Sequence, residues 1–139
     1  MLKRRIRAAK YQSIREGVAV METAILLPIL VVIVFAAMEC SNALFLRQSL
    51  TIAAYESATI LSESTGTYND ANEKCTEILS ARNVNSHTLI VTPNVTSSLN
   101  PGDLITIEVT SPASAYSIGP AWFFKNKQLE ATVYTVRAP

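Results

Sequence analysis

Residues 18–38 decide the fold, and they read VAVMETAILLPILVVIVFAAM. In these 21 residues Glu22 is the only ionisable side chain, and no basic residue occurs between Arg15 and Arg47. A helix rises about 1.5 Å per residue, so the stretch covers about 30 Å, which is the thickness of the hydrocarbon layer of a membrane. The sequence therefore predicts a single membrane-spanning helix.

The charges on either side of the span predict its orientation. Residues 1–17 hold six of the twelve basic residues and one of the eleven acidic residues, which leaves six basic and ten acidic residues for the rest of the chain. Because Lys and Arg stay on the cytoplasmic side, we expect residues 1–17 inside a bacterial cell and the C-terminal part in the periplasm. The acidic balance after residue 17 argues against a nucleic-acid-binding domain, since that part repels phosphate.

Glu22 has two interpretations. A carboxylate in the apolar layer costs about 2.5–3.5 kcal/mol, so its presence needs a reason. Glu22 either lies near the cytoplasmic interface and is hydrated there, or it is the counter-ion of a positive charge. If a peptidase cut after Gly17, the new α-amino group of Val18, with an intrinsic pKa of about 7.7–8.0, would supply that charge.

A family resemblance rests on this same junction. Gly17, the stretch 18–22 ending in Glu22, and the step Leu27-Pro28 resemble the leader junction of class III, type IV pilin-like proteins. More narrowly, the pattern is similar to that of the TadE-like minor pseudopilins of tight-adherence (Tad/Flp) pilus systems. In that family a prepilin peptidase cuts after the glycine that matches Gly17, and the glutamate that matches Glu22 belongs to the recognised motif. The chain departs from the pattern at Val18, where alanine is commoner, and at Thr23, where phenylalanine is common.

The resemblance implies a structural protein of the inner membrane. The expected function is a minor pilin-like subunit that is processed after Gly17 and helps to assemble the pilus. Its expected partners are the membrane, the prepilin peptidase, other pilin-like subunits and the inner-membrane assembly platform. An alternative stays open: an uncleaved, single-span periplasmic scaffold or binding protein.

Pro28 lies inside the predicted span. Proline lacks an N–H, so it leaves the carbonyl of Ala24 without its helical partner. We expect Thr23 or a neighbouring helix to satisfy that carbonyl. The proline then produces either a mild kink without a role or a flexible point that lets the span tilt during packing.

The helical pattern continues beyond the span into a stem, residues 39–66. Side chains on one stripe recur every three or four positions and are mostly apolar: Ala43, Leu46, Leu50, Ala53, Ser57 and Ile60. Gly66 ends the pattern, so we expect one helix from about Val18 to about Ser64.

The remaining residues, 67–139, predict a small α+β domain. Asp70 and Glu73 resemble a capping box that starts a second helix over about 70–83. Three β-rich stretches follow, at 89–91, 104–110 and 128–137, and Pro101-Gly102 predicts a type II turn. The predicted fold is a long transmembrane-plus-stem helix packed on the second helix and a three-stranded antiparallel sheet. The predicted divisions are a leader (1–17), a span (18–38), a stem (39–66) and this domain (67–139).

The loop over 111–127 contains three adjacent aromatic residues, Trp122, Phe123 and Phe124. They either cap the sheet or form a docking patch for a partner.

Catalytic and metal-binding chemistry has few candidates. His87 is the only histidine, and we expect it to be an exposed loop residue. Cys40 and Cys75 form no CxxC motif, and a continuous stem would hold them too far apart for a disulfide. The four glycines are scattered, so no phosphate-binding loop is expected. We therefore expect no enzyme activity, cofactor, metal or small-molecule substrate.

Overall fold

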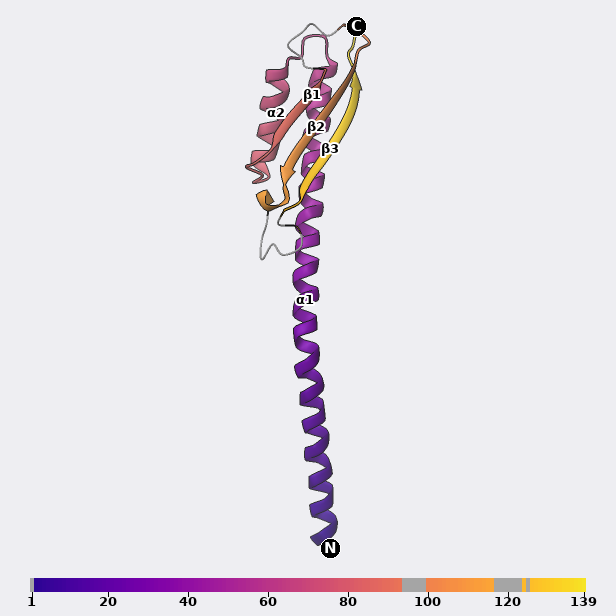
Figure 1. Cartoon of the computed structure of the whole chain (residues 1–139), viewed down its shortest axis with the longest axis vertical. Helices are drawn as coiled ribbons and strands as arrows, with labels where there is room; N and C mark the ends of the chain where they lie inside the picture. Colours follow the sequence, from indigo (N-terminus) through magenta and orange to yellow (C-terminus); the bar gives the residue numbers. More distant parts are fainter. Residues whose placement is uncertain (1, 94–99, 117–123, 125) are drawn as a thin grey trace. The chain divides into compact units, whose positions relative to one another are not determined.

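The computed structural model describes residues 2–93, 100–116, 124 and 126–139, with side chains described from residue 17 onward. The chain divides into two compact units, Met1–Ala37 and Met38–Pro139. The described elements are helix α1 (Leu2–Ser62), helix α2 (Tyr68–Ala81), strand β1 (Thr88–Thr92), strand β2 (Leu104–Pro112), the 3₁₀ turn η1 (Ala113–Tyr116) and strand β3 (Gln128–Val136). Figure 1 shows this α+β arrangement, which confirms the predicted fold class.

Helix α1 begins at Leu2, well before the predicted start at Val18. The leader contains Ala, Arg, Lys and Gln, which are good helix formers, and no proline. Gly17 costs about 1 kcal/mol relative to alanine inside a helix, which is too little to end it. The helix also continues through Pro28, as predicted for a proline tolerated inside a span.

The C-terminal half of α1 supplies one side of the hydrophobic core. Leu46, Leu50, Ala53 and Ser57 of the predicted stripe are buried, while Ala43 and Ile60 at its ends are half-buried. This stripe packs with apolar side chains of α2 and of the sheet. The 3.6-residue periodicity of the stem thus reflects burial against the chain's own domain.

The end of α1 is held tightly. Gly66 follows the helix, and a Cβ atom added there would lie 1.8 Å from the carbonyl oxygen of Ile60, so only glycine fits. Arg137, just after β3, donates from Nη1 to the carbonyls of Leu61 (2.9 Å) and Gly66 (3.0 Å) and from Nη2 to that of Ser64. A cation at the C-terminus of a helix also opposes the partial negative charge of the helix dipole.

Helix α2 starts earlier than predicted, because a different residue caps it. The hydroxyl of Thr67 accepts from the backbone N–H of Asp70, and the Asp70 carboxylate accepts from the backbone N–H of Thr67. The Thr67 hydroxyl also donates to the Asp70 carboxylate over 2.6 Å, and this bond, together with the one from the Thr67 backbone N–H, lowers the pKa of Asp70 below its usual value. The expected capping box of Asp70 with Glu73 is therefore wrong. Asp70 is the third residue of α2, and Thr67 is the N-cap.

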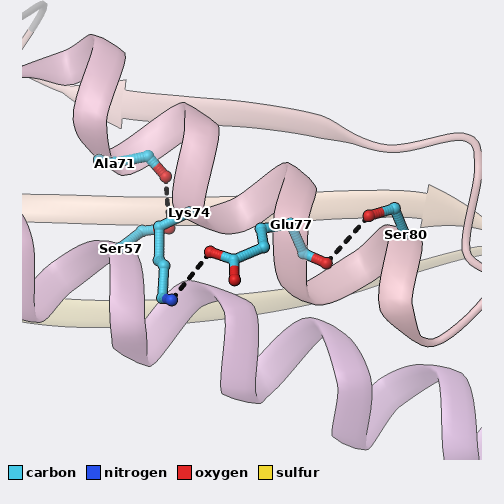
Figure 2. Close-up of polar contacts among 5 residues, drawn as sticks. All are labelled: Ser57, Ala71, Lys74, Glu77 and Ser80. Atoms are coloured by element: carbon cyan, nitrogen blue, oxygen red, sulfur yellow. Dashed lines mark hydrogen bonds and ion pairs between the residues drawn. The ribbon is translucent and has the colours of Figure 1, made fainter.

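Two helices meet through a buried hydroxyl. Ser57 of α1 donates to the carbonyl of Ala71 in α2 over 3.1 Å, as Figure 2 shows. Ser57 also lies 2.8 Å from the carbonyl of Ala53, so its oxygen sits between the two helices. This close approach requires small residues where α1 and α2 touch.

The sheet has the order β1-β2-β3, and both pairs are antiparallel. Alternate residues face the helices, and these are buried: Leu89 and Val91 in β1, Ile105, Ile107 and Val109 in β2, and Ala131 in β3. Leu129 and Val133, which lie two positions before and after Ala131 in β3, pack against the same core. Gly102 has a φ of 90°, and the backbone N–H of Asp103 donates to the carbonyl of Asn100, in keeping with the predicted turn.

His87 differs from its prediction as an exposed residue. It directly precedes β1, but its ring is half-buried and its Nε2 lies 3.4 Å from Oγ1 of Thr76 in α2. Its Nδ1 is buried and has no hydrogen-bond partner among the residues that the structure describes. Burial lowers the pKa of His87 below the ordinary 6.5. Packing of α2 beside the start of β1 causes this burial, and the local sequence does not encode it.

Candidate functional site

The leader junction and the span lie in the first compact unit. The large apolar side chains from Val18 to Val34 are between 43% and 69% exposed in the isolated chain. The helical segment Gly17–Ser62 contains a stretch that is long and apolar enough to cross a membrane. An apolar surface of this extent needs lipid or neighbouring helices around it. One apolar helix near the N-terminus is consistent with a single-pass membrane anchor.

Gly17, Val18 and Glu22 lie on consecutive turns of α1. Gly17 is helical, and a Cβ atom added there would meet nothing within 4 Å. Packing therefore gives no reason for a glycine at this position. Val18 and Glu22 are four residues apart and both are exposed, so their side chains lie one above the other on the same face.

The direction of helical side chains matters for Glu22. Side chains on an α-helix lean toward its N-terminus, so the carboxylate of Glu22 leans toward the turn that contains Val18. An α-amino group on Val18 would lie one helical turn from the side chain of Glu22 in the same chain. The arrangement is thus able to neutralise a charge at a new N-terminus.

Thr23 does not satisfy the carbonyl that Pro28 leaves without a partner. Its hydroxyl donates to the carbonyl of Ala19 over 2.9 Å, one turn before the carbonyl of Ala24. Of the two partners expected for the Ala24 carbonyl, only a neighbouring helix is therefore left. A shallow groove lined by Ala19, Val20, Thr23, Ala24 and Leu27 lies on the same part of the span. Small side chains of this kind let the backbones of two membrane helices come close together.

The predicted aromatic patch is only partly described. Trp122 and Phe123 lie outside the described residues, and Phe124 is half-buried. A different aromatic contact joins α1 and η1. The ring of Phe45 in α1 stacks on that of Tyr116 in η1, with 4.5 Å between the ring centroids.

The segment with the junction geometry is also the one that a family model matches. The family model described as TadE-like protein matches residues 17–59. Over these residues the chain is similar to TadE-like proteins. The match begins at Gly17, contains Glu22 and Pro28, and covers most of the stem. The match supports an association of the chain with Tad pilus systems. No curated protein and no solved structure matches the chain.

Sequence reasoning missed a groove between α1 and α2. Ile52 and Glu56 of α1 line it together with Lys74, Glu77, Ile78, Ala81 and Arg82, which come from α2 and its C-cap. No local pattern marks these residues as neighbours. The only signal in the sequence is the pair of apolar stripes, which requires the two helices to share one core.

Proposed function

We propose that this TadE-like chain is a minor pilin-like subunit that a prepilin peptidase cuts after Gly17. The single observation that carries the proposal is the family match, which starts at that glycine and includes Glu22. The mature chain would begin with Val18 and stay anchored by its span, with the C-terminal domain in the periplasm. Its role is structural, and its partners are other pilin-like subunits and the inner-membrane assembly platform.

Glu22 and the new N-terminus carry the assembly chemistry in this proposal. The amine of Val18 and the carboxylate of Glu22 each cost several kcal/mol when alone in hydrocarbon, and pairing offsets much of that cost. An amine paired with Glu22 of a neighbouring subunit fixes the height of one subunit relative to the other. The pair thus sets the register of assembly.

Intact-mass measurement of the membrane-extracted protein tests the processing step. We expect a chain that has lost residues 1–17 and whose N-terminal sequence begins at Val18. The matched variant is Gly17→Ala, which the structure tolerates because a Cβ atom there meets no neighbour. A Gly17→Ala chain that inserts normally but keeps its leader shows that the peptidase requires the glycine. A wild-type chain that still begins at Met1 contradicts the proposal and leaves an uncleaved anchor.

Substitution of Glu22 tests the counter-ion role. We expect Glu22→Ala and Glu22→Gln to insert into the membrane and to reduce the number of pili, because the amine of Val18 loses its partner. Glu63→Gln, an exposed change near the outer end of the stem, is the control and should leave piliation unchanged. Normal piliation with Glu22→Ala would refute the counter-ion role.

A further inference from the structure

Strand β3 lies at the edge of the sheet and pairs on one side only. Figure 1 shows β2 between β3 and β1, in agreement with the strand order. Two hydrogen bonds at the ends of the β2–β3 pair show which backbone groups of β3 face β2. The N–H of Ala113 donates to the carbonyl of Lys127 over 2.8 Å, and the N–H of Arg137 donates to that of Asp103 over 3.0 Å.

These two bonds continue the register of β2 and β3. Residues that exchange hydrogen bonds alternate along an antiparallel pair, so the odd-numbered residues of β3 bond to β2. The N–H and C=O groups of its even-numbered residues therefore point away from the sheet. The side chains of the same even-numbered residues are exposed.

The opposite edge of the sheet, on β1, is protected against further pairing. β1 has five residues, and Pro93 follows it. The hydroxyl of Tyr68 in α2 donates to the carbonyl of Leu89 in β1 over 3.3 Å. β3 is nine residues long and contains neither proline nor lysine, which are residues that keep exposed edges from pairing. β3 thus has the features of an edge that accepts a further strand.

The exposed face of the sheet is apolar beside the C-terminal end of β3. Leu104, Tyr134 and Val136 are between 52% and 67% exposed there. Leu104 lies opposite Val136 in the register, and Tyr134 is two positions before Val136 on the same face. The three side chains therefore form one apolar cluster next to the unpaired edge.

The same face is acidic toward the N-terminal end of β3. Glu108 of β2 lies opposite Thr132, so it is a diagonal neighbour of Glu130 in β3. The three strands contain no basic residue. Neither carboxylate makes an ion pair within the part of the chain that the structure describes. The negative charge beside this part of the edge is thus uncompensated.

We propose that the edge of β3 binds an extended segment of another protein chain, which runs antiparallel to β3 and carries a basic residue beside Glu130. Apolar residues of the segment pack beside Tyr134 and Val136. The backbone of the segment supplies the hydrogen bonds, and its alternating side chains determine which segment is accepted. An antiparallel direction continues the pattern of the sheet, and antiparallel pairs are slightly more stable per residue than parallel ones.

Charge complementarity favours a different chain over a second copy of this one. A second copy would offer the edge of its own β3 or β1, and neither strand contains a basic residue. Its β3 would instead bring another Glu130 to an edge that is already acidic. The inference goes beyond the subunit role proposed above and does not require cleavage of the leader.

A synthetic peptide tests the proposal with the full-length protein in detergent. The probe has nine residues and blocked ends, and it consists of valine and threonine with one lysine at its seventh position. In an antiparallel register over the whole of β3, its first residue lies beside Val136 and its lysine beside Glu130. We expect saturable binding by fluorescence anisotropy, and about fivefold to tenfold weaker binding when glutamate replaces the lysine.

N-methylated peptides test the backbone pairing and leave the protein unchanged. In this register the amide of the fifth peptide residue faces Thr132, whereas the amide of the sixth residue points away from β3. We expect N-methylation of the fifth amide to weaken binding at least tenfold and N-methylation of the sixth to have little effect. A peptide with its lysine at the third position tests the direction, because that lysine reaches Glu130 only in a parallel strand.

Protein variants provide the matching changes on β3. Thr132→Pro removes an N–H that points away from β2, so the β2–β3 ladder keeps its hydrogen bonds. We expect this variant to bind the lysine peptide at least tenfold more weakly, whereas Thr132→Val, which keeps the N–H, binds it like wild type. Glu130→Lys should reverse the preference between the lysine and glutamate peptides. Circular dichroism verifies that the variants keep their fold.

Three results would overturn the proposal. The first is a wild-type protein that binds no peptide at millimolar concentration, and the second is equal loss of binding from both N-methylations. The third is self-association of wild type that Thr132→Pro abolishes, which would assign the edge to a second copy. The assay needs neither processing nor a pilus, so its failure is distinct from failure of the proposed function.

Discussion

Arg137 fastens the end of the last strand to the end of α1, and its loss should destabilise the C-terminal unit. The guanidinium donates to the carbonyl of Leu61 in the last turn of α1, which has no helical partner there, and to those of Ser64 and Gly66 just after the helix. Hydrogen bonds from a charged donor contribute about 1.5–3 kcal/mol each when they are shielded from water. The hydrogen bond to the Ser64 carbonyl is exposed, so in a variant without the guanidinium a water molecule takes over part of this bond.

We therefore expect Arg137→Met to reduce the free energy of unfolding by about 3 kcal/mol. Methionine keeps most of the aliphatic stem, so the change isolates the guanidinium. In a domain of this size 1 kcal/mol corresponds to roughly 4–8 °C, which predicts a fall in Tm of about 12–24 °C. Arg137→Lys should fall between Arg137→Met and wild type, because an ammonium group does not reach all three carbonyls at once.

Thermal unfolding of the full-length protein in detergent measures this effect. Near-UV circular dichroism reports the packing of tyrosines such as Tyr68 and Tyr116 in the C-terminal unit. Helicity of the span, which micelles protect, does not contribute to that signal. A Tm for Arg137→Met within about 2 °C of wild type would refute the reasoning, since it would limit the contribution of all three bonds to about 0.5 kcal/mol.

Two further predictions concern the same unit. Gly66→Ala should lower the free energy of unfolding by about 1–3 kcal/mol or more, because the new Cβ atom would overlap the carbonyl of Ile60. Urea unfolding measures this loss. Gly17→Ala is the control, because a Cβ atom there meets no neighbour. The burial of His87 should make stability depend on pH. Its pKa in the folded state is below the ordinary 6.5, so the unfolded chain binds the proton more readily. The stability is then complete above pH 6.5 and declines as the pH falls through the lower, folded pKa. Melting curves between about pH 7.5 and 5.5 should show this decline for wild type and a flatter profile for His87→Asn, and equal slopes would show that His87 is not the cause.

The apolar helix, the stem stripe and the strands were predictable from sequence. Each depends on a local pattern of apolar residues and on which of its faces is shielded from water. Twenty-one residues with one charge form a stretch that is long and apolar enough to cross a membrane. A stripe such as Leu46, Leu50 and Ala53 requires a partner surface for one side of a helix. Alternation of Ile105, Ile107 and Val109 similarly requires a sheet with one covered face. Gly17, Glu22 and Pro28 were also singled out by their spacing within a few turns of one helix, and the roles assigned to them stay predictions.

The boundary of α2 shows where local patterns become ambiguous. Thr67 with Asp70 and Asp70 with Glu73 have the same spacing, and both pairs are able to cap a helix. The structure selects Thr67, which places Ala71, Cys75 and Leu79 in the core. A helix that began three residues later would have Ala71 in its first turn. The two pairs are equally able to cap the helix by their residue types, so packing of the core decides which of them does so.

The sequence by itself determined the long apolar helix and the periodic faces of the elements, because these follow from neighbours along the chain and from the contrast between apolar surface and water. Only the tertiary structure decided which distant groups meet. It placed Arg137 on the end of α1, buried His87 beside Thr76, and set α2 against Ile52 and Glu56 to form the groove. These contacts join residues that lie 11 to 76 positions apart. Their geometry depends on how three elements fill one core, which no single segment of the sequence specifies.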